Sequence, residues 1–152
     1  MSKNHKNVRR GFTIFELLVV VGILGILASM VGPAMSRIVR HQRANRAAMV
    51  IAADLQNAFA VAARQREPVR IQADATTRSY QFIDRKSGNI LRIRTFYGDT
   101  SEYRLTELVF NPTTIAVFPS GISSPAVTVT LANGDYGKTI TASTAGFIRV
   151  SH

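Results

Sequence analysis

The apolar residues of this chain gather first in one long run near the N-terminus. From Phe12 to Ser36 there are 25 residues, and only Glu16 is charged. A helix needs about 20 predominantly apolar residues to cross the hydrocarbon core of a bilayer. The pattern therefore predicts a transmembrane helix over residues 12–36. Pro33 removes one helical hydrogen bond and clashes with the preceding turn, so we expect a helix kink at this position.

After Ser36 the apolar residues recur at steps of three and four, which is the spacing of an amphipathic helix. This pattern predicts that residues 37–67 continue as an amphipathic helix into the soluble domain. Glu67 ends the helix, because the residue before a proline avoids helical geometry. The expected apolar stripe consists of Ala44, Ala47, Ile51, Leu55, Ala58, Phe59 and Ala62.

Four arginines occur every third residue at the start of this amphipathic segment. They are Arg37, Arg40, Arg43 and Arg46. Because each step of three drifts by about 60° on a helix with 3.6 residues per turn, they fan across half its circumference. A solvated helix face is the favoured interpretation, with contacts to lipid headgroups or to a filament as the alternative.

From Val69 onward the period shortens to two, which is typical of strands. Turn signals such as Asn111-Pro112 and Asn133-Gly134 separate the candidates. About seven or eight short strands after one long helix predict an α+β fold, in which the β-rich domain of residues 68–152 packs on the helix stripe. The expected strands are 69–73, 80–83, 90–96, 103–110, 114–118, 127–131, 139–141 and 147–150.

The first eleven residues form a basic leader that carries Lys3, Lys6, Arg9 and Arg10. A secretory signal would have an apolar core of about 7–15 residues followed by a small-residue cleavage site. Here the core is longer and no such site closes it. Gly11 instead offers a small, flexible site before the core, where a protease could reach the backbone.

The segment Gly11-Phe12-Thr13-Ile14-Phe15-Glu16 resembles the prepilin processing site of type IV pilins and type II secretion pseudopilins. The resemblance implies that prepilin peptidase cleaves between Gly11 and Phe12, and that the amine of Phe12 is then N-methylated. It also implies that Glu16 supports filament assembly by pairing with the Phe12 amine of a neighbouring subunit. Pro33 matches a proline that the family uses for local loss of helix during packing.

The second half resembles the H-type minor pseudopilins and FimT-type minor pilins (the GspH/FimT family). The resemblance covers Phe118-Pro119-Ser120-Gly121 and the C-terminal run from Gly146 to Val150, among other segments. It implies a long helix under two small antiparallel sheets, in a subunit near the tip of a short pseudopilus. The chain would be a single-pass inner-membrane protein with a periplasmic C-terminal domain. Its partners would be other minor and major pseudopilins or pilins, prepilin peptidase and inner-membrane lipid.

Composition narrows the chemistry that is available. The net charge is +10, and removal of the leader with its four basic residues would leave 10 − 4 = +6. There is no cysteine, which excludes disulfides and cysteine metal sites. His5, His41 and His152 do not form a pattern for catalysis or metal binding, and glycine-rich phosphate loops are absent. We therefore expect a non-enzymatic protein without metal or cofactor.

DNA binding is the competing function. Some FimT-type minor pilins bind DNA through a C-terminal Gly-Arg-x-Arg pattern, where this chain has Gly146-Phe147-Ile148-Arg149. Arg149 matches and Phe147 replaces the first arginine, which removes one cation that could contact phosphate. An exposed Phe147 beside Arg149 could stack on a base, but packing of Phe147 into the sheet is favoured. A solvated strand face is likewise favoured for Arg92, Arg94 and Phe96. A simple membrane-anchored β domain without an assembly role is the third alternative.

Overall fold

The computed structural model describes residues 12–99 and 101–151, and within its long helix the side chains of residues 30–34 are not described. The chain divides after Arg37 into two compact units. The helix α1 spans Ile14–Gln65 and joins the two predicted helical segments into one element of 52 residues. It ends where Arg66 takes the left-handed conformation with φ of 56°, just before Pro68.

The sequence predicts a transmembrane helix over residues 12–36. Within the part of the chain that the structure describes, no helix is long and apolar enough to cross a membrane. The membrane assignment therefore rests on the sequence pattern alone, and the domain boundaries drawn from the sequence remain predictions.

The first sheet has five strands in the order β3-β2-β1-β5-β6, and all of its pairs are antiparallel. The buried face of this sheet carries Val69 and Ile71 of the first strand and Tyr80 and Phe82 of the second. The residue between the two members of each pair points outward. β3 lies at one edge of the sheet. The strands are β1 Val69–Asp74, β2 Ser79–Asp84, β3 Ile90–Thr95, β5 Thr114–Val117 and β6 Ser123–Ser124.

The second sheet has four antiparallel strands in the order β4-β7-β8-β9. Burial alternates strictly along Val127–Leu131 of β7, with the odd positions inside. β9 lies at the edge of this sheet and pairs only with β8 among the described strands. The strands are β4 Glu107–Asn111, β7 Val127–Asn133, β8 Tyr136–Ala142 and β9 Ile148–Ser151.

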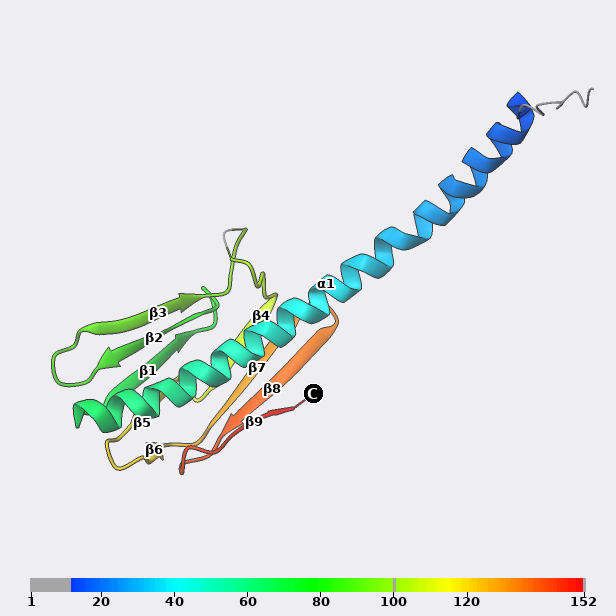
Figure 1. Ribbon diagram of the computed structural model, residues 1–152. Helices are drawn as coiled ribbons and strands as arrows, with labels where there is room; N and C mark the ends of the chain where they lie inside the picture. Colours follow the sequence, from blue (N-terminus) through cyan, green and yellow to red (C-terminus); the bar gives the residue numbers. More distant parts are fainter. Residues whose placement is uncertain (1–11, 100, 152) are drawn as a thin grey trace, which may run out of the picture. The chain divides into compact units, whose positions relative to one another are not determined.

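The described residues of the second unit form a hydrophobic core to which its helical part and both sheets contribute. Figure 1 shows this part of α1 running alongside the strands of both sheets. The stripe expected from the sequence is confirmed, since its members from Ala44 to Ala62 are buried and Phe59 packs partly buried against them. The α+β class and the two small antiparallel sheets are also confirmed.

The strands differ from the prediction at several boundaries, and two of the differences have a clear cause. The described residues form nine strands, because the two-residue strand β6 has too short a pattern to be seen in the sequence. The strand expected from Tyr103 begins only at Glu107. Arg104 has a φ of 46°, which interrupts the extended conformation, and the Leu105 N–H instead donates to the Phe96 carbonyl at 3.0 Å.

Candidate functional site

The start of α1 is built around Thr13, which lies directly before the first helical residue. Its Oγ1 accepts a hydrogen bond of 3.2 Å from the backbone N–H of Glu16. A threonine cap followed by glutamate three residues later is the capping-box spacing, and the helix dipole favours a carboxylate in the first turn. Sequence reasoning overlooked this role of Thr13, although the Thr-x-x-Glu spacing is its signal. Glu16 therefore lies where the helix itself stabilises a negative charge.

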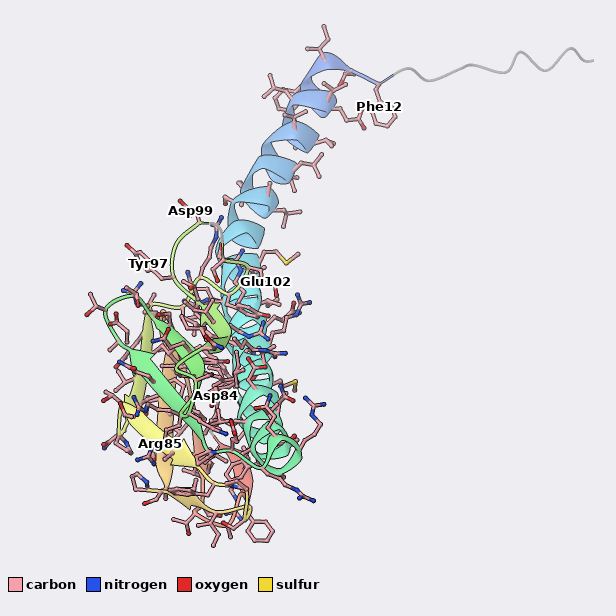
Figure 2. The ribbon with its side chains drawn as sticks, turned by 90° about the vertical axis from the view of Figure 1, so that its left-hand side faces the viewer. Phe12, Asp84, Arg85, Tyr97, Asp99 and Glu102 are labelled. Atoms are coloured by element: carbon pink, nitrogen blue, oxygen red, sulfur yellow. The ribbon has the colours of Figure 1, made fainter. Side chains whose placement is uncertain are left out.

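An exposed, mostly apolar stretch of α1 follows this cap. All residues from Phe12 to Ser29 are exposed, and Phe12 itself is 80% exposed (Figure 2). Soluble monomers seldom expose contiguous apolar patches of more than a few hundred Å².

Some of the predicted site residues cannot be placed. Gly11 and the rest of the leader lie outside the described residues, and Pro33 is one of the residues whose side chains are not described. Cleavage after Gly11, methylation of Phe12 and the kink at Pro33 accordingly stay predictions. Within the described residues, no ion pair involves Glu16.

Phe147 is 79% exposed, so the prediction that it packs into the sheet is wrong. The reason is local: β9 begins only at Ile148, and Phe147 lies in the preceding turn. There the Phe147 carbonyl accepts from the Ser143 N–H at 2.9 Å, and the Phe147 N–H donates to Ser143 Oγ at 3.1 Å. Arg149 is also exposed and pairs in register with Thr141, while Ile148 is partly buried against the core.

A charged cluster that sequence reasoning missed lies between α1 and the first sheet. The side chain of Asp54 is only 5% exposed, and it accepts hydrogen bonds from Arg92 Nη1 and Arg94 Nε, each at 2.6 Å. The Tyr80 hydroxyl donates to the same carboxylate at 2.7 Å. The interpretation of Arg92, Arg94 and Phe96 as a solvated face is therefore wrong.

The electrostatic environment of this cluster follows from burial and pairing. Burial raises the pKa of Tyr80 far above its ordinary value, and the negative charge of Asp54 raises it further. The hydrogen bond to Asp54 raises the pKa of Arg94. Asp54 occupies a stripe position, three residues after Ile51 and four before Ala58, and that placement was the available signal.

The described residues contain no group of three or more histidine, aspartate or glutamate side chains that could hold a metal ion. The Asp54 carboxylate is engaged by two arginines and a tyrosine, so its partners are structural.

Comparisons with known proteins agree with this architecture. The family model for the type II transport protein GspH matches residues 47–146. The model for the prokaryotic N-terminal methylation motif matches residues 6–32, which include Gly11, Phe12 and Glu16. No curated protein sequence shows a significant match to the chain.

Solved structures with the same fold include a type IV minor pilin and a minor pseudopilin. Two crystal forms of the type IV minor pilin FimU of Pseudomonas aeruginosa give TM-scores of 0.59 and 0.56 at 22% and 21% identity, covering 73% and 71% of this chain and 90% and 92% of FimU. The minor pseudopilin EpsH from the type 2 secretion system of Vibrio cholerae gives a TM-score of 0.52 at 19% identity, covering 72% of this chain and 96% of EpsH. At these identities the likeness concerns the fold.

Proposed function

Because this chain belongs to the GspH family of type II transport proteins, we propose that it is a minor pseudopilin of a type II secretion pseudopilus. In this role it is a structural, non-enzymatic subunit near the tip of a short filament. Its partners are the other minor and major pseudopilins, and prepilin peptidase processes it before assembly.

The uncovered apolar surface of residues 12–29 is the observation that carries this proposal. In that range every side chain is exposed, and only Glu16 is charged. Apolar surface contributes about 25 cal/mol per Å² when it is removed from water. A bundle of such helices in a filament removes this surface from water, and so does a lipid bilayer. We therefore propose that the inner membrane holds residues 12–36 before assembly, with the β-rich domain in the periplasm.

Processing and assembly involve Gly11, Phe12 and Glu16. Cleavage after Gly11 creates a new amine at Phe12, which is then methylated. In the filament the Glu16 carboxylate pairs with this amine on a neighbouring subunit and sets the axial register of the two chains. The exposure of both Phe12 and Glu16 supports this role, because both groups are accessible to another chain.

Co-expression with prepilin peptidase and the remaining pseudopilins tests the proposal. Mass spectrometry of the purified chain should give a mature N-terminus at methylated Phe12, and the chain should be recovered with sheared filaments. Gly11→Leu should leave the leader in place and exclude the chain from filaments. An uncut native chain would favour the simple membrane-anchored β domain.

A second candidate is a FimT-type minor pilin that acts in type IV pilus assembly or DNA uptake. The exposed pair of Phe147 and Arg149 supports it, since an aromatic ring can stack on a base and an arginine can contact phosphate. Restoration of secretion, or of piliation, in strains that lack their own subunit separates the two candidates. A salt-sensitive mobility shift of single-stranded DNA that is lost in Arg149→Ala would favour the second.

A further inference from the structure

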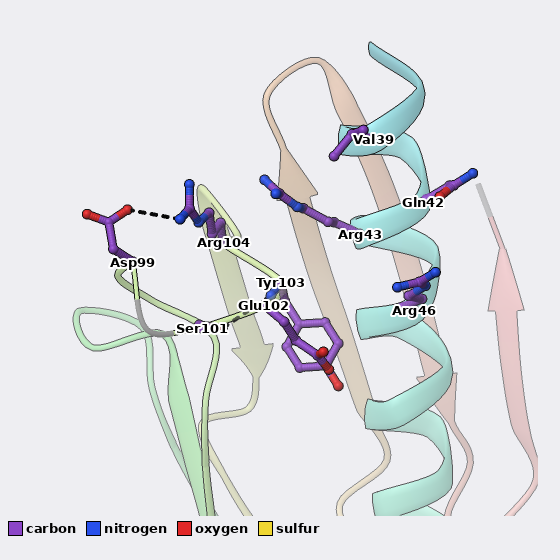
Figure 3. Close-up of a pocket in the computed structure, with 9 residues that line it drawn as sticks. All are labelled: Val39, Gln42, Arg43, Arg46, Asp99, Ser101, Glu102, Tyr103 and Arg104. Atoms are coloured by element: carbon purple, nitrogen blue, oxygen red, sulfur yellow. Dashed lines mark hydrogen bonds and ion pairs between the residues drawn. The ribbon is translucent and has the colours of Figure 1, made fainter. Parts of the chain in front are cut away.

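A pocket of about 420 Å³ lies between the helical part of the second unit and the segment that connects β3 to β4 (Figure 3). Val39, Gln42, Arg43 and Arg46 line its helical wall, and the connecting segment supplies Glu102, Tyr103 and Arg104 among others. Arg43 reaches from α1 toward the segment that carries Arg104 (Figure 3). Arg43, Arg46 and Arg104 thus all line one hollow of the surface.

Among the described residues, the two helical arginines have no partner of opposite charge. Arg43 and Arg46 are three residues apart and therefore neighbours on one side of the helix. Arg43 is half-buried, yet within the described residues neither arginine has an ion pair or a side-chain hydrogen bond. Like charges that line one pocket without a counter-charge attract an anion to it.

Arg104 adds a third cation, at a local cost in backbone energy. Its φ of 46° is uncommon for a residue other than glycine, asparagine or aspartate, and strained residues of this kind gather at binding sites. Its Nη2 lies 3.6 Å from an oxygen of Asp99, whose side chain is 96% exposed. Such an exposed ion pair contributes little free energy, so Arg104 can also contact a ligand.

The same pocket carries negative charge on its other wall. Glu102 is exposed, and the pKa of Tyr103 is raised, chiefly by a hydrogen bond to Glu102. The Glu102 carboxylate therefore lines the same pocket as the arginines and forms no ion pair with them among the described residues. A ligand that suits both walls has an anionic group and a cationic group a few ångströms apart.

We propose that this pocket binds a phosphate ester with a nearby ammonium group, which is the chemistry of a phosphoethanolamine headgroup. Arg43 and Arg46 hold the phosphate, because guanidinium groups match phosphate oxygens in planar, paired hydrogen bonds. Arg104 closes the phosphate side, and Glu102 receives the ammonium group.

Two sources could supply this ligand: a membrane phospholipid or a soluble phosphate ester. The helical wall of the pocket begins at Val39, three residues after the apolar segment ends at Ser36. A subunit held in a bilayer by residues 12–36 therefore has headgroups available near this part of the sequence. The lipid source rests on the proposed membrane storage, whereas the binding chemistry does not.

Calorimetric titration of the full-length chain in a maltoside detergent tests the chemistry without lipid or filaments. Glycerophosphoethanolamine should bind saturably. The double variant Arg43→Gln/Arg46→Gln should lose at least about tenfold in affinity, since each hydrogen bond between charged groups contributes more than a factor of ten. The control Arg37→Gln/Arg64→Gln removes the same charge from α1 outside the pocket and should bind as the wild type does.

The variant Glu102→Gln tests the contact to the ammonium group separately from the contact to the phosphate. It should lower the affinity for glycerophosphoethanolamine. It should leave unchanged or raise the affinity for glycerophosphoglycerol, which has no ammonium group. Equal binding of inorganic phosphate and glycerophosphoethanolamine would overturn the ammonium contact. No saturable binding, or full affinity in Arg43→Gln/Arg46→Gln, would overturn the site.

Vesicles of phosphatidylethanolamine and phosphatidylglycerol identify the source. Native mass spectrometry of the full-length chain released from them should detect one retained phosphatidylethanolamine, which Arg43→Gln/Arg46→Gln loses. If the chain binds the glycerophosphate ester in detergent but retains no lipid, the ligand is a soluble ester and the lipid source is overturned. Failure of filament assembly would not change either measurement, so the two proposals fail separately.

Discussion

The Tyr80 hydroxyl donates a hydrogen bond of 2.7 Å to the carboxylate of Asp54, which lies 26 residues earlier in the chain on α1. Arg92 and Arg94 of β3 complete the shell of this carboxylate. The contact therefore ties the edge strand of the first sheet and its neighbour β2 to the helix. A buried carboxylate needs such partners, because a charge without compensation in a protein interior is strongly destabilising.

Removal of both arginines should expose this dependence. Arg92→Ala/Arg94→Ala leaves the Asp54 charge buried with only a tyrosine partner, and we expect the free energy of unfolding to fall by about 3 kcal/mol or more. Adding Asp54→Ala should restore part of the loss, because the unpaired charge is then gone. Urea unfolding of the detergent-solubilised chain measures both changes.

The exposed Arg70 of β1 provides the control for this experiment. Arg70→Ala should change the free energy of unfolding by no more than about 0.5 kcal/mol. If the triple variant is less stable than Arg92→Ala/Arg94→Ala, the buried carboxylate is not the source of the instability.

The stability of the fold should fall in alkaline solution because of Tyr80. Its pKa in the folded chain is raised by burial and by the charge of Asp54, whereas an unfolded tyrosine titrates at about 10.0. Above that pH the unfolded chain releases a proton that the native chain keeps, so the stabilisation is complete below pH 10 and declines as the pH rises. Tyr80→Phe should flatten this decline in urea unfolding measured on either side of that pH. An unchanged slope in Tyr80→Phe would contradict this origin.

The spacing of apolar residues predicted those parts of the fold that are determined by residues close together in the sequence. The stripe from Ala44 to Ala62 and the alternation in β7 are repeated signals, and burial of one face follows from each. The start of the expected strand at Tyr103 was wrong because one residue, Arg104, takes a positive φ that no period reveals.

The site was predictable only where it consists of a contiguous motif. The segment from Gly11 to Glu16 lies within the range that the methylation-motif model matches, so sequence alone pointed to it. The Asp54 cluster joins residues 38 and 40 positions apart, and the pocket joins the helix to the β3–β4 connection. Such pairings depend on strand register and on the packing of sheet against helix, which a single sequence does not specify.

Glu16 can support filament assembly or help to cap α1, and a variant of Thr13 distinguishes these two roles. On the proposed pairing, Glu16→Ala should leave membrane insertion intact and strongly reduce recovery of the chain in filaments, because the Phe12 amine of the neighbouring subunit would lose its partner. Thr13→Ala removes the hydroxyl that caps α1 at 3.2 Å, at a cost of about 1 kcal/mol, but keeps the carboxylate. Its recovery in sheared filaments should therefore stay near that of the wild type. Equal losses in both variants would assign Glu16 to helix capping.

Phe147 should contribute to surface contacts and little to folding. Its side chain is 79% exposed in the turn before β9, so Phe147→Ala should change the free energy of unfolding by no more than about 0.5 kcal/mol. Phe110 of β4 is the matched control, because it is 3% exposed in the core, and Phe110→Ala should lose about 3–5 kcal/mol. Thermal unfolding of both variants measures the difference. A loss in Phe147→Ala that approaches the loss in Phe110→Ala would mean that the ring packs against the domain in solution. The turn held by Ser143 would then differ from the one described, and neither a partner subunit nor a nucleic-acid base could use the ring.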